Sequence, residues 1–141
     1  MNATIKPVGD AIGYVRRHPE MFFPGQKPNP LTCIQHLVME ILSLGADDVR
    51  LCHHEGWWMV SSNHDWFVGL SEQELFTRII PLPQVGANAC RVEIVLGAYA
   101  ESIVTIDPMG TRHPVQGVEP GEDVWSMMTS PGARSLAFRF A

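Results

Sequence analysis

Cysteine is scarce in this chain of 141 residues, which has three, at positions 33, 52 and 90. They form neither a closely spaced pair nor a metal-ligand spacing, so neither a disulfide framework nor a cysteine metal site is expected. An odd, dispersed set of cysteines is typical of a protein in a reducing compartment, and we expect the cytoplasm.

Long apolar runs are absent as well. No run approaches the ~20 residues that a membrane-spanning helix needs, and the N-terminus lacks the apolar core of a signal peptide. Positive charge is also in short supply, because ten Lys and Arg stand against fifteen Asp and Glu, a formal net charge of −5. We therefore expect neither a membrane nor a nucleic acid as partner.

The composition that remains is that of a folded domain. Hydrophobic residues make up 45% of the chain and charged residues 18%, which argues against disorder. A chain of this length buries roughly two thirds of its unfolded surface as one unit, so we expect residues 1–141 to form a single domain. The sequence contains no internal repeat, low-complexity segment or linker.

The most informative stretch, residues 29–48, predicts one amphipathic helix. Asn29 is a good N-cap, Pro30 suits the first helical position, and Gly45 suits the C-terminal end. Apolar residues recur between them every three or four positions and predict a core-facing stripe: Leu31, Ile34, Leu37, Val38, Ile41 and Leu42.

A second face of this helix is polar and carries His36, Glu40, Ser43 and Asp47. By pattern alone, the face is a solvated edge, which is the usual place for charged side chains. The other interpretation is that Glu40, the single carboxylate among apolar neighbours, has a chemical task.

The rest of the chain alternates short helical and extended patterns. Helices are predicted over residues 8–18, 71–78 and 88–98, and strands over residues 48–53, 57–62, 102–107, 111–116 and 135–140. Residues 125–128 fit either a strand or a helical turn. Because helices come early and hairpin strands late, we expect an α+β two-layer sandwich with helices on one face of a mostly antiparallel sheet.

Several segments resemble, in order, the motifs of one known family. The segments YVRRHPEMFF and NPLTCIQHLVMEILSLGADDVRL resemble the start of the ATPase domain of the DNA gyrase B subunit and its topoisomerase relatives, members of the GHKL superfamily. WWMVSSNHDWF stands in place of the V-x-D-x-G-x-G turn. VGANACRVEIVLGAYAESIVTID is similar to the glycine-rich lid and the helix after it, and TSPGARSLAFRF to the G-T-x-V-x-F strand. The likeness covers most of the chain and implies a Bergerat-type fold with a shortened lid.

The resemblance also implies roles for individual residues. It assigns the general base of ATP hydrolysis to Glu40, with ATP and magnesium as cofactors if that chemistry is kept. A nucleotide would then be expected to contact seven further residues, namely Ser43, Asp47, Ser62, Asn63, Gly86, Arg91 and Ser135.

Around the expected nucleotide, this sequence departs from the family pattern. Leu44 stands where the family has its magnesium-binding asparagine, and leucine offers no oxygen ligand. The adenine-binding aspartate is replaced by Ser62, or by Asn63 if the register slips by one. His64 and Trp66 replace two glycines that let the backbone approach the ligand.

The lid and the last strand depart too. Of three lid glycines only Gly86 remains, because the other two positions hold Ala89 and Arg91. The tight phosphate cradle of backbone N–H groups is therefore expected to be lost, although Arg91 can still pair with an anion. The threonine of the last strand corresponds to Ala133 or Ser135, and both alignments stay open.

Two functions remain in view. We expect a degenerate GHKL domain that has lost ATP hydrolysis, needs no cofactor, and serves as a binding or regulatory module for a protein partner or for itself. The alternative is a nucleotide-binding protein or weak ATPase that uses Glu40 as its base.

Three other constellations are open to two interpretations each. His53 and His54 would ligate a metal with residues 63–65 if a hairpin joins them, or they are ordinary surface histidines. Cys33 beside His36 is either an activated thiol or a small buried side chain. Four aromatic residues form a core plug or a ligand platform: Trp57, Trp58, Trp66 and Phe67.

Overall fold

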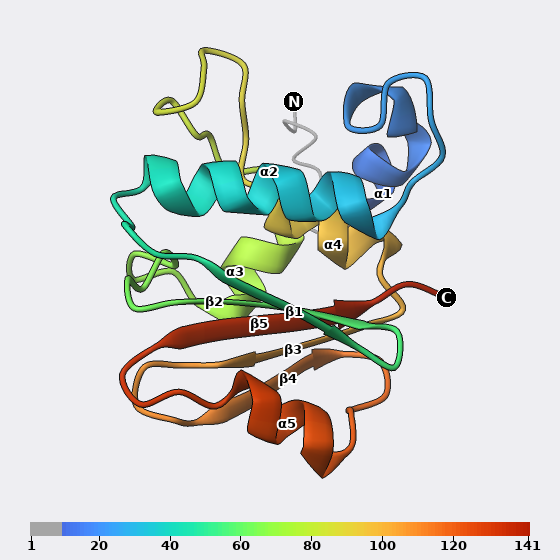
Figure 1. Cartoon of the computed structure of the whole chain (residues 1–141). Coiled ribbons are helices and arrows are strands. Elements are labelled where there is room, and N and C mark those ends of the chain that lie inside the picture. Colours follow the sequence, from blue (N-terminus) through green and yellow to red (C-terminus); the bar gives the residue numbers. More distant parts are fainter. Residues whose placement is uncertain (1–9) are drawn as a thin grey trace, which may run out of the picture.

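A computed structural model describes residues 10–141 and places helices against a five-stranded sheet (Figure 1). The helices are α1 (Asp10–Arg17), a 3-10 turn η1 (Pro19–Met21), α2 (Pro30–Ser43), α3 (Glu72–Thr77), α4 (Glu93–Tyr99) and α5 (Glu122–Met128). The strands are β1 (Arg50–His54), β2 (Trp57–Ser62), β3 (Ser102–Ile106), β4 (Arg112–Gln116) and β5 (Arg134–Arg139). Val8 and Gly9, the first residues of the predicted first helix, lie outside the described residues.

All neighbouring strands are antiparallel, in the order β1-β2-β5-β3-β4. The last strand, β5, enters between two hairpins, so that Ala137 lies opposite Met59 on one side and Val104 on the other. The predicted α+β class with an antiparallel sheet is confirmed.

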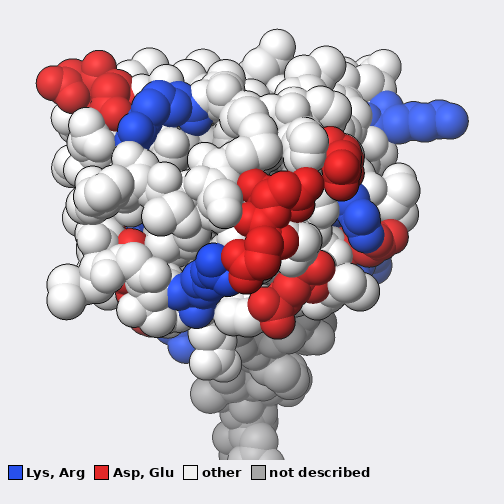
Figure 2. Space-filling view, turned by 60° about the horizontal axis from the view of Figure 1, so that its bottom comes forward, with Lys and Arg blue, Asp and Glu red and all other residues white. Residues whose placement is uncertain are grey.

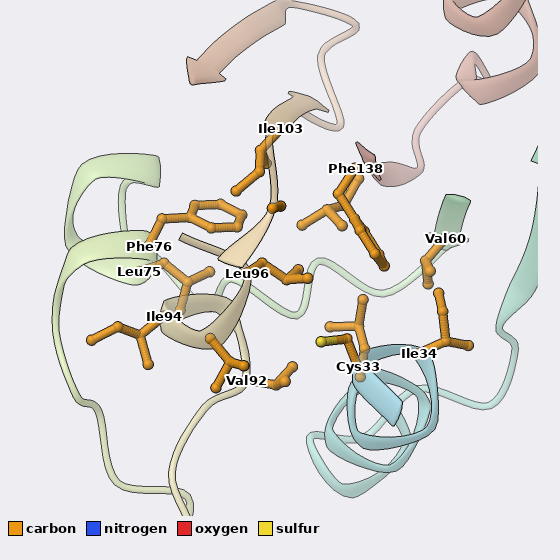
Figure 3. Close-up of a cluster of buried hydrophobic side chains, with 14 of the residues drawn as sticks. Cys33, Ile34, Val60, Leu75, Phe76, Val92, Ile94, Leu96, Ile103 and Phe138 are labelled. Atoms are coloured by element: carbon orange, nitrogen blue, oxygen red, sulfur yellow. The ribbon is translucent and has the colours of Figure 1, made fainter. Parts of the chain in front are cut away.

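Four helices, α1 to α4, lie on one face of the sheet, and α5 lies on the other (Figure 1). Side chains of α2, α3, α4 and the sheet point toward one another in the larger core (Figure 3). The smaller core, under α5, contains Trp57, Met59, Val104, Ile106, Val124, Trp125, Met128 and Ala137. Of the two options predicted for residues 125–128, a strand or a helical turn, the structure has the helical turn, as part of α5. None of the helices within residues 10–141 is both long and apolar enough to cross a membrane.

Helix α2 begins and ends where its sequence predicts. The Asn29 side chain accepts a hydrogen bond from the Thr32 N–H at 2.9 Å, and Gly45 ends the helix at φ +110°. Ile34 and Leu37 are buried as expected. Leu31 and Leu42, at the margins of the apolar stripe, are about half exposed instead, at 57% and 48%.

Helix α4 starts at Glu93, five residues later than predicted. The backbone before it is extended because residues 80–82 pair with residues 89–91. The Leu82 N–H donates to the Ala89 carbonyl at 2.9 Å, and the Arg91 N–H donates to the Ile80 carbonyl at 2.8 Å. These pairings close residues 79–91 into a loop that stands beside α2.

Candidate functional site

Glu40 points away from water, with only 1% of its surface exposed. The Val92 N–H at the start of α4 donates to its Oε1 at 2.8 Å, and Arg91 Nε lies 2.9 Å from its Oε2. The interpretation of this face as a solvated edge is therefore wrong at Glu40. A helical pattern shows which residues share a face, but here α4 and the loop before it cover part of the polar face.

Arg91 lies between two carboxyl groups, and we call Glu40, Arg91 and Glu93 the carboxyl cluster. Arg91 Nε is 3.6 Å from Glu93 Oε1, and all three side chains are at least 96% buried. Trp66 completes the surroundings, because its indole N–H donates to Glu93 Oε2 at 3.0 Å and its carbonyl accepts from Arg91 at 2.6 Å.

The carboxyl cluster holds its charges in contact without fully directed hydrogen bonds. Arg91 Nε, Glu40 Oε2 and Glu93 Oε1 are buried without a hydrogen-bond partner, so the N–H is near both oxygens but aimed at neither. Burial raises the pKa of Glu40 well above its ordinary value, and the nearby Glu93 carboxyl raises it further, against the opposing effect of Arg91 and the Val92 N–H. The raised pKa favours the protonated, uncharged form of Glu40.

Glu40→Gln should make stability less sensitive to pH. Because the pKa of Glu40 is higher in the folded than in the unfolded protein, its protonated form contributes stability fully below the ordinary glutamate pKa of 4.5. That contribution is lost as the pH rises through the folded pKa. The free energy of unfolding of Glu40→Gln, relative to wild type, should therefore increase between pH 4.5 and 8 in urea titrations.

The control for this titration is Glu119→Gln, which removes an exposed carboxyl. The free energy of unfolding of Glu119→Gln should differ little from that of wild type at each pH, since surface substitutions seldom change stability much. If the free energy of unfolding of Glu40→Gln, relative to wild type, were also constant from pH 4.5 to 8, Glu40 would be ionised throughout that range.

A groove of about 310 Å³ lies beside the carboxyl cluster, between α1, η1, α2, the loop 79–91 and Val92. Glu40 forms part of its wall. The rest of the lining is mostly apolar: Tyr14, Met21, Phe22, His36, Met39, Ile79, Leu82, Val85, Asn88, Ala89, Cys90 and Val92. The arrangement suits an apolar occupant more than a charged one.

Ser62 and Asn63 both bind Asp48. The Ser62 hydroxyl donates to Asp48 Oδ1 at 3.3 Å, and the Asn63 N–H donates to the same oxygen at 3.1 Å. Asp47, the residue expected to contact a nucleotide, is exposed and Asp48 holds the turn. Sequence reasoning missed Asp48, and the only available signal was its position as the first residue of the strand predicted over residues 48–53, which in the structure starts at Arg50.

Of the three side chains expected to stand at glycine or asparagine positions of the resembled family, Trp66 is buried, and Leu44 and His64 are half-buried. The Trp66 ring is fully buried and meets Phe67 edge-on, with ring centres 5.6 Å apart. Leu44 packs against the same core. His64 lies over Gly45, where an added Cβ would be 3.7 Å from its Cε1. Trp66 and Phe67 therefore fill the core and do not form a ligand platform.

The other expected nucleotide contacts are scattered. Gly86 lies in the loop, with open space where a side chain would stand, and Ser43 is half-buried near the end of α2. Ser135 lies on the α5 face of the sheet, where its hydroxyl donates to the Met128 carbonyl at 2.7 Å. Of the eight predicted site residues, only Glu40 and Arg91 form a direct pair across the fold.

The histidine grouping suggested by the sequence does not form. In the β1–β2 hairpin His54 is opposite Trp57, whereas residues 63–65 follow the far end of β2. His54 instead lies 2.9 Å from Asp123 and 3.4 Å from Glu55. Ligand atoms of these three residues lie within 4.8 Å of one another, and their ion pairs account for that closeness.

The cysteine on α2 is an inert core residue. Cys33 is 1% exposed, and burial raises the pKa of its thiol to about 12. A thiol needs a lowered pKa to act as a nucleophile. The interpretation of Cys33 as a small buried side chain therefore fits the structure, and that of an activated thiol beside His36 does not.

Fold and site together define an α+β domain with a buried carboxyl cluster next to an apolar groove. Comparison with protein-family models, curated proteins and solved structures finds no match for this chain.

Proposed function

We propose that the chain is a degenerate GHKL-like domain that does not hydrolyse ATP and acts as a binding or regulatory module. The observation that carries the proposal is the environment of Glu40, which contacts Arg91 and the Val92 N–H inside the protein. The family part of the proposal rests on the order of the motifs along the sequence, and a resemblance of that kind does not by itself establish a function.

A general base must be ionised at the working pH and within hydrogen-bond reach of the water it activates. The raised pKa of Glu40 favours its protonated form, and Arg91 lies against the oxygen that the Val92 N–H leaves free. Glu40, protonated and covered by Arg91, therefore meets neither requirement.

Magnesium and nucleotide binding are also poorly supported by the residues present. Leu44 has no oxygen to offer a magnesium ion, which takes near-octahedral oxygen ligation. Trp66 fills, with a buried ring, the position of a family glycine. No cofactor is therefore part of the proposal.

A second candidate is a nucleotide-binding protein or weak ATPase. The observation in its favour is that Glu40 lines the groove of about 310 Å³ while its pKa is strongly raised. Carboxyls with shifted pKa values beside cavities are where enzymes often keep their acids and bases. In this candidate, ATP with magnesium would have to draw Arg91 away from Glu40.

Calorimetric titration with ATP and with ADP, each with magnesium, separates the two candidates. We expect no binding tighter than about 100 μM and no phosphate release above buffer. A melting scan gives an independent reading, because a ligand at ~100 times its dissociation constant adds ~2.7 kcal/mol to stability. Tighter binding, with hydrolysis that disappears in Glu40→Gln, would establish the enzyme instead.

The working environment is part of the same proposal. Cys33 is buried and Cys52 and Cys90 are half-buried, and all three are free, which supports a reducing cytoplasm. The net charge of −5 supports a protein partner or a second copy rather than a nucleic acid or an anionic membrane.

A further inference from the structure

Two segments that lie side by side in the fold are almost free of charge. Residues 29–46 contain α2, and residues 79–90 form the loop beside it. Together they hold one Asp, Glu, Lys or Arg, which is the buried Glu40, although 18% of the chain is charged. Loss of charge over a continuous area is typical of the centre of a protein interface.

Large apolar side chains are exposed on these same segments. On α2, Leu31 is 57% exposed, Met39 54% and Leu42 48%, and on the loop Ile79 is 46% and Val85 40% exposed. Scattered exposed apolar residues are ordinary, but a contiguous set marks an interaction site. We call these five residues the apolar face.

The apolar face has a ridge next to a groove. Leu31 and Leu42 project from the outer side of α2, since eleven residues correspond to about three helical turns. Met39 stands between them and the groove, which Ile79 and Val85 also line. A ridge beside a groove of the same apolar character is self-complementary under a two-fold axis, because each copy offers what the other accepts.

We propose that the apolar face is the interface between two copies of this chain, with the α2 ridge of each copy seated in the groove of the other. The inference deepens the proposed function, on which it rests, by naming the partner. A stable interface needs about 800 Å² on each side, so the contact would extend beyond the five residues of the apolar face, along the 14-residue α2, about 21 Å long, and the adjoining groove.

The distribution of charge favours a second copy as the occupant. The chain is acidic overall, and Figure 2 shows acidic side chains gathered on the side that carries α5, whose first turn contains Glu122 and Asp123. Two molecules of the same sign repel least where both are uncharged. The apolar face, on the opposite side of the sheet from α5, meets that condition.

Sedimentation equilibrium over a range of concentrations tests the proposal. Wild type should sediment as a dimer of twice 15.7 kDa. Met39→Glu should weaken the dimer at least about 30-fold, as loss of an interface hot spot does. Met109→Glu is the matched control, because Met109 is 90% exposed in the β3–β4 turn, and it should dimerise like wild type.

Mixing two variants tests the ridge-in-groove geometry. Leu42→Glu and Val85→Lys should each be monomeric, since both contacts of the symmetric dimer would place a charge against an apolar surface. In a mixed dimer, one contact is the wild-type pair and the other joins Glu to Lys. An equimolar mixture should therefore recover dimers that neither variant forms alone.

Three results would overturn the inference: a wild-type monomer at all concentrations, a Met39→Glu dimer of wild-type strength, or no recovery on mixing. Circular dichroism melts confirm that the variants are folded. ATP hydrolysis would overturn the proposed function whatever the oligomeric state. A monomer that neither binds nor hydrolyses ATP would overturn only the inference.

Discussion

Arg91→Met should cost the protein about 3–5 kcal/mol of folding free energy, the usual loss when a buried ion pair is deprived of one partner. Arg91 is the cation of the carboxyl cluster, and 96% of its side chain is buried. Without it, two buried carboxyl groups, those of Glu40 and Glu93, lose the cation that lies near both. Loss of the 2.6 Å hydrogen bond to the Trp66 carbonyl adds to the effect.

Urea unfolding at pH 7 measures this loss, and Arg78→Met is its control. Arg78 pairs with Glu74 at 3.9 Å on the surface, where ion pairs contribute little, so the same substitution should have a much smaller effect there. Adding Glu93→Gln to Arg91→Met should restore part of the stability. Equal losses at the two arginines would show that the carboxyl cluster is not held by charge.

Trp66→Ala should have an effect of similar size, about 3–5 kcal/mol, as large-to-small substitutions of buried aromatic residues have. The ring is fully buried in the larger core against Phe67. Its removal leaves a cavity and also deprives Glu93 Oε2 of the indole N–H. Both losses fall on the part of the fold that joins the β2–α3 turn to α4.

Two further variants separate these contributions. Trp66→Phe keeps most of the packing and removes the N–H, so it should cost about 1–3 kcal/mol, the penalty for an unsatisfied buried acceptor. Trp58→Ala, at a half-buried position of β2, should cost less than Trp66→Ala. If Trp58→Ala lowered the free energy of unfolding more than Trp66→Ala does, Trp66 would not be the tryptophan on which the larger core depends.

Local signals predicted much of the fold. The Asn29 cap and Gly45 set the limits of α2, and the pair Ser71 and Glu74 forms the predicted capping box of α3. Such signals act over three or four residues, so they can be recognised without knowledge of the rest of the chain. The order of strands within each hairpin follows from short turns in the same way.

Prediction failed where distant segments meet. Asn88 suits a helix cap and so predicts too early a start for α4, because pairing with residues 80–82 keeps residues 89–91 extended. The order of motifs predicts that Ser135 lies near Glu40, but the sheet separates the two residues. Strand alternation alone does not say which face of a sheet a residue takes when both faces are covered.

The sequence by itself determined the element types, the caps of α2 and α3, and the uncharged composition of residues 29–46 and 79–90. Only the tertiary structure decided that Glu40 is buried against Arg91 and the Val92 N–H, 52 residues along the chain. The reason is physical: a cap depends on neighbouring backbone, whereas the charge state of a carboxyl depends on every group that packs around it.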